Sequence, residues 1–550
     1  MAKTPRLSVP KGIVKGRRQM RLSITWTATA LAVAAASVPA LAAKDGGTLR
    51  MIHRDNAPSG SIHEEATNSV TEPFMSVFNN LVMFDQTKPI NSDETLVPDL
   101  ATGWTWNDTK TRLTFKLHDG VKWHDGKPFS SADVKCTFDK LLGKSQDRFR
   151  KNPRSVWYHN LKEVVVNGPS EATFVLADPQ PGFIQLLASG YTPIYPCHVD
   201  AQTMRTAPIG TGPFKFVEWK RNETMTFVKN PDYFKKGKPH VDSIVWTVIP
   251  SRATRMLAFI AGDQDVTFSV DVTVPLLRDI HEKAPKAVCN LHPTNVSTNL
   301  IVNSEKPPFD NPKIRRAMDM AIDRDAFIKI LFEGKADKSG AMLPPPEGQW
   351  GLSKKELSKI PGYGSSGDVE KSRAEARKIM EGLGYTADKP LAVKVATRNI
   401  AVYRDPAVIL IDQLKSIHIA GELEVVDTSI WHAKVARKDY SVGLNLTGIG
   451  VDNPDAALME NYTCKSERNY TQYCNKEVDQ EIFAQSKETD PKKRHAMVID
   501  IQKKLIADVA RPIIYYSRAA TCWQPYVKGI VPHVNSIYNG ARYEDVWIDK

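Results

Sequence analysis

Alternating hydrophobic and polar positions predict a strand, two turns and a helix between residues 111 and 142. Leu113, Phe115 and Leu117 alternate with polar neighbours, which is typical of a half-buried strand. Asp-Gly pairs at 119–120 and 125–126 predict tight turns. The segment from Ser130 to Asp133 has the pattern of a capping box, and the apolar positions 134, 138 and 141 follow on one helical face.

Residues 391–426 predict a βαβ unit. Leu391, Val393 and Val395 mark the first strand, positions 423 and 425 mark the returning strand, and an apolar helical face lies between them. Asp405-Pro406 predicts the helix N-cap with proline in the first turn. The loop 397–404 would then run from the carboxyl end of a strand into a helix N-terminus, where open α/β sheets bind ligands and free N–H groups favour anions.

The first 42 residues have the pattern of a secretory signal peptide. An apolar run from Ile24 to Ala36 precedes Ala40-Leu41-Ala42, a small-residue cleavage pattern. Residues 1–43 contain no acidic residue, and seven basic residues precede the apolar run: Lys3, Arg6, Lys11, Lys15, Arg17, Arg18 and Arg21. We therefore expect a cleaved segment 1–42 and a free periplasmic protein; the alternatives are a buried helix or an uncleaved anchor, and the export route, Sec or twin-arginine, is left open.

Removing this segment changes the charge. The whole chain has a net charge of +12, and the remaining 67 basic and 62 acidic residues leave +5. Spread over about five hundred residues, this charge does not indicate nucleic-acid binding.

The mature length predicts several domains, because one hydrophobic core stops growing near ~250–300 residues. The alternation of strand-like and helix-like segments predicts an α/β class.

Six cysteines permit three disulfides in an oxidising compartment. Cys464 and Cys474 bracket a short loop rich in Tyr and Asn, and we expect them to be bonded to each other. The pairing of Cys136, Cys197, Cys289 and Cys522 is left open. A metal site is the competing interpretation, but CxxC spacing and a nearby His cluster are both absent from the sequence.

Four stretches of the chain together resemble one protein family. Residues 113–142 read LTFKLHDGVKWHDGKPFSSADVKCTFDKLL, and residues 210–234, 310–327 and 452–479 agree with the family in order and spacing. The whole mature chain resembles the bacterial extracellular solute-binding proteins of the dipeptide, oligopeptide and nickel type. Members of this family are periplasmic receptors of ABC importers.

The resemblance implies an α/β, two-lobed periplasmic-binding-protein-like fold with a hinge and an extra inserted domain. The first lobe is discontinuous, so that the chain would form three domains. The implied boundaries are 44–75, 210–295 and 520–550 for the first lobe, 76–209 for the inserted smaller domain, and 296–519 for the second lobe.

Three residues are candidates for ligand binding. The resemblance places an ammonium-binding carboxylate near Asp452, with Asp455 as the other possible match; an Asx turn or a helix cap is the alternative role. Arg404 is the candidate partner of a ligand anion, with Arg398 in reserve, and an exposed pair with Asp405 is the alternative. Trp431 resembles an aromatic residue beside the cleft of relatives, and its alternative role is core packing.

The function that we expect is reversible capture of small peptides and their delivery to ABC permease subunits, by a monomer without cofactor or metal. A non-peptide ligand of the same protein class, such as a nickel chelate, haem, an opine or an oligosaccharide, is the main alternative. A peptide-binding chaperone is another. The sequence lacks GxSxG, HExxH and paired metal-ligand motifs, which disfavours a secreted hydrolase and any other enzyme.

Overall fold

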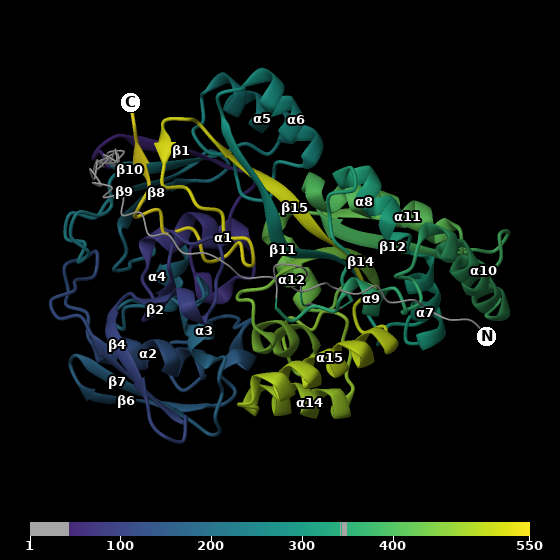
Figure 1. Ribbon diagram of the computed structural model, residues 1–550, viewed down its shortest axis with the longest axis horizontal. Helices are drawn as coiled ribbons and strands as arrows, with labels where there is room; N and C mark the ends of the chain where they lie inside the picture. The colour runs from purple at the N-terminus through teal and green to yellow at the C-terminus, as the bar shows by residue number, and fades with distance from the viewer. Residues whose placement is uncertain (1–42, 341–342, 344–348) are drawn as a thin grey trace, which may run out of the picture. The chain divides into compact units, whose positions relative to one another are not determined.

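Three β-sheets of four or five strands organise the part of the chain that the computed structural model describes, residues 43–340, 343 and 349–550 (Figure 1). The expected signal peptide, residues 1–42, lies outside this part. Residues 43–550 form one unit. The implied lobe boundaries therefore stay a prediction.

The first sheet contains the earliest strand of the described chain. It has the order β1-β10-β9-β8 and consists of β1 (Thr48–His53), β10 (Ser243–Val248), β9 (Thr224–Lys229) and β8 (Phe214–Lys220). Strand β1 is parallel to β10, whereas β9 is antiparallel to both of its neighbours, β10 and β8. The chain that follows β1 contains η1 (Ile62–Glu64), α1 (Asn68–Phe74) and η2 (Met75–Val77), and the chain that follows β10 contains α5 (Arg252–Ala261) and α6 (Val274–Lys283).

The second sheet confirms the pattern seen between residues 111 and 142. Its order is β4-β5-β7-β6, with β4 (Ala101–Trp106), β5 (Arg112–Leu117), β7 (Glu171–Leu176) and β6 (Leu161–Gly168). The alternating positions of β5 are buried as predicted. Neighbouring short elements are β2 (Val82–Phe84), η3 (Asp93–Thr95), β3 (Leu96–Pro98), η4 (Ser155–Tyr158), α3 (Phe183–Ala188) and α4 (Ala201–Thr206).

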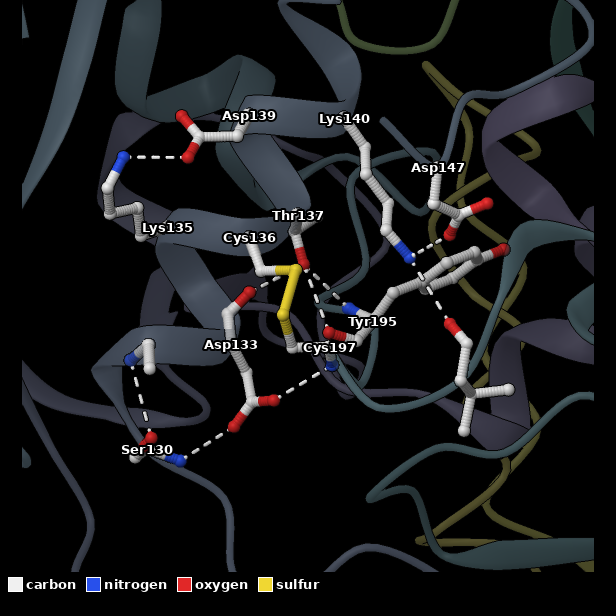
Figure 2. The surroundings of a disulfide bond; sticks show 12 residues. Ser130, Asp133, Lys135, Cys136, Thr137, Asp139, Lys140, Asp147, Tyr195 and Cys197 are labelled. Atoms are coloured by element: carbon white, nitrogen blue, oxygen red, sulfur yellow. Dashed lines mark hydrogen bonds and ion pairs between the residues drawn. A yellow bond between two sulfur atoms is a disulfide. The ribbon is translucent and has the colours of Figure 1, made fainter. Parts of the chain in front are cut away.

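Helix α2 (Ser131–Leu141) begins with the predicted capping box, in which Ser130 and Asp133 satisfy each other's backbone N–H groups. Asp133 also accepts a hydrogen bond of 2.9 Å from the backbone N–H of Cys197. Figure 2 shows that this contact lies beside the disulfide between Cys136 and Cys197, whose Cα atoms are 5.6 Å apart. The bond therefore joins α2 to the segment before α4.

The third sheet has five strands in the order β13-β12-β14-β11-β15. They are β13 (Ile419–Val426), β12 (Leu391–Arg398), β14 (Val442–Gly448), β11 (Val288–Val302) and β15 (Ile513–Trp523). Helices α7 (Pro312–Ala321), α8 (Arg324–Phe332), α10 (Ser366–Gly382) and α11 (Ala401–Lys415) share a hydrophobic core with this sheet, and Figure 1 shows α11 beside β12.

The βαβ unit is confirmed, but the predicted start of its helix is wrong. Strands β12 and β13 are parallel, with α11 between them. The helix begins at Ala401 instead of after Asp405, because the N–H groups of Tyr403 and Arg404 already bond to the carbonyl of Ile400. Pro406 consequently lies inside the helix. The expected loop 397–404 is reduced to the two residues between β12 and α11.

Strands β11 and β15 connect two parts of the fold. The two strands pair with each other on both sides of their register shift between Pro293 and Ser297. The C-terminal part of β15 also makes bridges to Val266 and Val272 in the chain that follows α5, and Val266 in turn bridges to β1. Cys289 and Cys522 are directly opposite in this ribbon and form a disulfide, with Cα atoms 4.1 Å apart.

The remaining elements follow β13, except α9, which precedes α10. They are α9 (Lys354–Leu357), α12 (Thr428–Ala436), the π-helical turn η5 (Asp455–Met459), α13 (Glu460–Tyr462), α14 (Lys476–Lys487), α15 (Pro491–Ala507), β16 (Val527–Lys528) and β17 (Trp547–Ile548). The predicted disulfide between Cys464 and Cys474 is confirmed. Within residues 43–550, no described helix has the length and apolar character needed to cross a membrane.

Candidate ligand-binding site

An ion pair joins the carboxyl ends of β1 and β12, two strands that are far apart in the sequence and that each have a parallel neighbour. Asp55 follows β1, Arg398 ends β12, and the Arg398 guanidinium donates to Asp55 Oδ2. Thr428 Oγ1 accepts from Arg398 Nε and donates to Asp55 Oδ2, both at 2.7 Å. Burial by itself raises the pKa of Asp55, but the nearby positive charges, that of Arg398 foremost, and the Thr428 hydrogen bond together outweigh it, and the pKa lies well below its ordinary value. The pair is therefore ionised and links the first sheet to the third.

Buried polar and aromatic side chains surround this ion pair and continue along the same junction. We call this set, together with Asp452 on the loop that packs against Tyr538 through Gly448, the junction cluster: Arg54, Asp55, Arg154, Tyr191, Arg398, Tyr403, His432, Asp452, Arg468 and Tyr538. The cluster draws on the chain after β1, the residue before η4, the chain after α3, the end of β12, α11, α12, the loop after β14, the chain after α13 and the C-terminal segment. Carboxyl ends of parallel strands are the usual ligand-binding edge of an open α/β sheet.

Asp452 occupies the loop after β14 and is buried without a cationic partner among the described residues. Asn535 Nδ2 donates to its Oδ2 at 3.3 Å, and the backbone of Gln349 adds a second stabilising hydrogen bond. Burial outweighs both bonds and raises the pKa of Asp452 to about 7. A carboxylate in this environment gains strongly from a cation that enters with a ligand.

Asp452 is not a helix cap. The N–H of Asp455 bonds instead to Asn453 Oδ1 at 3.0 Å, so that Asn453 makes the local turn. Two glycines in the same loop admit aromatic rings: a Cβ on Gly448 or on Gly450 would lie 2.6 Å from a ring atom of Tyr538 or of Trp157, respectively. The loop that carries Asp452 is thus packed against rings of the junction.

Asp455, the other sequence candidate, has its own cation. Its Oδ1 lies 2.8 Å from Arg494 Nη2, and Gln485 and Gln180 donate to its two oxygens at 2.8 and 3.0 Å. Both oxygens are therefore satisfied within the protein. Of the two candidates, only Asp452 has a carboxylate that lacks a positive partner in the described structure.

The two arginine candidates differ in their surroundings. Arg404 lies in the first turn of α11, is exposed, and donates to Asn399 Oδ1 at 3.2 Å. The expected alternative pair between Arg404 and Asp405 is wrong, because Asp405 pairs with Arg252 at 3.1 Å. Arg398, the reserve candidate, is buried and held by Asp55 and Thr428. A ligand contact of Arg404 stays a prediction.

Trp431 lies on α12 and is fully buried. Its indole Nε1 donates to Asn445 Oδ1 at 3.1 Å, and its ring packs with Ile301, Val435 and Tyr440 in a small core. This environment corresponds to the alternative role in core packing. A ligand contact of Trp431 stays a prediction that no observed contact supports.

Several residues of the junction cluster were not predicted from the sequence. Arg54 directly follows β1, and its position after a strand is the only sequence signal that could have indicated it. His432 follows Trp431 on α12, and both of its ring nitrogens are buried without a hydrogen-bond partner. Burial lowers the pKa of His432 well below its ordinary value, so the ring is neutral.

The cluster has the chemistry of a binding site for charged organic groups. It combines aromatic faces with guanidinium groups and carboxylates, which suits ammonium and carboxylate groups of a ligand. Among the described residues, no group of three or more His, Cys, Asp and Glu side chains is arranged to hold a metal ion.

Comparison with known proteins gives relatives of similar length. The chain is 26% identical over 476 residues to the probable di/tripeptide-binding protein 5 of Pseudomonas aeruginosa, with 81% of this chain and 84% of that protein covered. It is 25% identical over 490 residues to the glutathione-binding protein GsiB of Salmonella typhi, with 87% and 90% covered.

Solved structures share the fold. The periplasmic binding protein DppA of Helicobacter pylori, in complex with the peptide STSA, superposes with a TM-score of 0.80 at 21% identity over 92% of this chain and 99% of that one. The fold is thus the two-lobed α/β fold of periplasmic binding proteins, as expected. The family model for the middle region of bacterial extracellular solute-binding proteins, family 5, matches residues 95–469, and the chain therefore belongs to this family.

Proposed function

We propose that the protein is the exported, non-enzymatic receptor of an ABC importer and that it captures short peptides by binding their α-ammonium group at Asp452. The peptide-binding relatives in Pseudomonas aeruginosa and Helicobacter pylori support the ligand class. The observation that carries the proposal is the buried Asp452 carboxylate, which has no cation of its own in the described structure.

The physical argument concerns the cost of burying a charge. An ionised carboxylate in a water-poor site is unfavourable unless a cation and hydrogen bonds compensate it. A peptide ammonium supplies both the positive charge and three N–H donors. The rings of Tyr191 and Tyr538, whose centroids are 4.8 Å apart, would provide apolar surface for the rest of the ligand, since Tyr538 packs against Gly448 in the loop that carries Asp452.

The cellular role follows from the same proposal. The protein would be free in the periplasm after removal of residues 1–42, would act as a monomer without cofactor, and would deliver its ligand to membrane permease subunits. Closure of the two lobes around the ligand would create the surface that the permease recognises. Nucleic acid is not a proposed partner, because the mature charge of +5 is small for the length of the chain.

A calorimetric titration of the ligand-free mature protein tests this proposal. The titrants are a panel of di- and tripeptides and the same peptides with an acetylated amino terminus. We expect binding of free-amine peptides and a loss of two to four decades in affinity on acetylation, because a buried carboxylate would be left unpaired at a cost of about 3–5 kcal/mol.

Equal affinity for free and acetylated peptides would exclude the ammonium contact. Absence of binding to every peptide would exclude peptide capture. Mass spectrometry of small molecules that co-purify with the natively exported protein then identifies the ligand class directly. Peptide turnover during the titration would contradict the non-enzymatic role.

A further inference from the structure

Arg54 is a buried cation without a counter-ion in the junction cluster. Its side chain is 5% exposed, and its guanidinium carbon lies 4.6 Å from the centre of the Phe268 ring. It makes no hydrogen bond or ion pair with any described residue, and its Nε is fully buried. A buried guanidinium with five donors and no acceptor is costly unless another group supplies the acceptor.

The carboxylates around Arg54 are directed at other partners. Asp55 is bound by Arg398, and Asp271 is bound by Arg255 with N···O distances of 2.6 and 3.0 Å. Glu72 is held by Ser269, and burial raises the pKa of Glu72 to about 7. None of these carboxylates forms an ion pair with Arg54.

Arg154 is a second buried guanidinium without a carboxylate partner. It is 2% exposed and lies 3.8 Å from the centre of the Tyr191 ring, which itself packs on Tyr538. Its Nη2 donates to the backbone carbonyls of Ile62 and Glu65 at 3.0 and 2.7 Å, while its Nη1 is buried without a partner. The side chains of Glu64 and Glu65 are held by other basic residues, namely Arg150, Lys151 and Arg205.

The other charges of the cluster cancel in pairs. Arg398 is bound to Asp55 and Arg468 is bound to Glu460. Arg511, outside the cluster, also lacks a carboxylate, but both of its terminal nitrogens have acceptors, Asn461 Oδ1 at 2.8 Å and the Arg468 carbonyl at 2.9 Å, whereas Nη1 of Arg154 has none. In the described part of the cluster, two guanidinium groups and the single carboxylate of Asp452 are left to be neutralised.

We infer that the ligand is a short acidic peptide with one ammonium and two carboxylate groups, a net charge of −1, and that Arg54 binds one of these carboxylates. The inference rests on the proposed function, because Asp452 is taken to bind the ammonium. Arg54 can meet a carboxylate with two parallel N–H···O hydrogen bonds. The carboxylate at Arg54 can come from an acidic side chain or from the peptide C-terminus.

Four tripeptides separate these sources. They are Ala-Glu-Ala, Ala-Gln-Ala and the C-terminal amides of both, so that the ligand carries two carboxylates, one of either kind, or none. Calorimetric affinities are measured for the mature wild-type protein, for Arg54→Met, and for the control Arg278→Met. The Arg278 side chain is 67% exposed and, among the described residues, forms an ion pair only with the exposed residue Glu333.

For the wild type and the control, we expect Ala-Glu-Ala to bind most tightly and each carboxylate removed to weaken binding by roughly 10- to 100-fold. In Arg54→Met, one of these two losses disappears while the other persists. The loss that disappears identifies the carboxylate at Arg54.

The inference is overturned if the wild type does not distinguish Ala-Glu-Ala from Ala-Gln-Ala amide, or if Arg54→Met changes all four affinities by one factor. If Arg54→Met does not fold, Arg54→Lys replaces it. The lysine keeps the positive charge but lacks the parallel N–H donors of the guanidinium group, so the affinity loss on removing the carboxylate at Arg54 should become smaller without disappearing. Peptide binding without any dependence on carboxylates rejects this inference alone. No binding of any free-amine peptide rejects the proposed function itself.

Discussion

Asp55 and Arg398 are separated by more than three hundred residues, yet they form one buried ion pair between the first and third sheets. The side chains are 11% and 1% exposed, respectively. Thr428 bonds to both partners and fixes their geometry. The pair therefore couples the two sheets directly at the proposed binding site.

We predict that Asp55→Asn destabilises the protein by about 3–5 kcal/mol, because Arg398 is left as a buried charge without a counter-ion. Urea unfolding at neutral pH measures this change. Asp405→Asn is the matched control, since it removes an ion pair with Arg252 in which Asp405 is 46% exposed. The control should change stability by less than about 1 kcal/mol; equal effects of the two variants would contradict the assigned role of the buried pair.

Substitution of Asp452 by Asn should weaken the binding of free-amine peptides by two to four decades in affinity. The amide keeps the shape of the side chain but cannot neutralise an ammonium. Asp455→Asn serves as a contrast, because it breaks the buried pair with Arg494 and should lower the free energy of unfolding. An Asp452→Asn protein with unchanged affinity would remove this residue from the site.

The raised pKa of Asp452 predicts a pH-dependent affinity. With a pKa of about 7 in the ligand-free protein, Asp452 is protonated at pH 6 and must release a proton to bind an ammonium. Affinity should therefore rise as the pH increases from 6 towards 7 and level off above it, with close to one proton released per ligand at pH 6. Titrations in buffers of different ionisation enthalpy count these protons, and Asp452→Asn should release fewer.

The same pKa has the opposite effect on stability without ligand. The folded state holds the proton more tightly than the unfolded chain, whose aspartate titrates near 3.8. The contribution of Asp452 to folding is therefore lost as the pH rises from about 4 to about 7, by on the order of 4 kcal/mol. Asp452→Asn should then be more stable than the wild type at pH 8, and nearly equal to it at pH 4. Unfolding curves at the two pH values test this.

Removal of the Cys464–Cys474 disulfide by paired serine substitutions should lower the free energy of unfolding by about 2–3 kcal/mol, as expected for a loop of 10 residues. The Cys136–Cys197 bond closes 61 residues and should contribute more, about 4 kcal/mol. Urea unfolding of both double variants shows which disulfide contributes more to the free energy of unfolding. Peptide mapping without reductant that finds free thiols at 464 and 474 would contradict the pairing.

The exported protein should begin near Ala43, since the signal pattern ends with Ala40-Leu41-Ala42. Amino-terminal sequencing of periplasmic material gives the answer. A membrane-bound product that retains residues 1–42 would show that the segment is an anchor.

Local features of the fold could be predicted from the sequence, whereas features that depend on distant partners could not. The capping box of α2 was predictable because Ser130 and Asp133 are three residues apart. The start of α11 was mispredicted because Asp405-Pro406 resembles a helix N-cap followed by proline. The helix in fact begins at Ala401, where backbone N–H groups already bond to the carbonyl of Ile400.

The candidate site illustrates the same limit. Asp452 and Asp455 are indistinguishable in the sequence, and they differ because Arg494, Gln485 and Gln180 all bind Asp455. Arg54 follows a strand like many other polar residues, and its isolation depends on where Arg398 and Arg255 direct their charges. Of the three disulfides, only the one that closes a short loop could be assigned.

The bond between Cys289 and Cys522 restricts how the lobes can move. Because these residues are directly opposite in the ribbon of β11 and β15, the two strands cannot slide along each other at that end. We expect lobe rotation to be absorbed by bending between Pro293 and Ser297, where the ladder is interrupted. We expect the disulfide to block translation along the strands, so that lobe closure would return Asp55 and Arg398 to the same alignment.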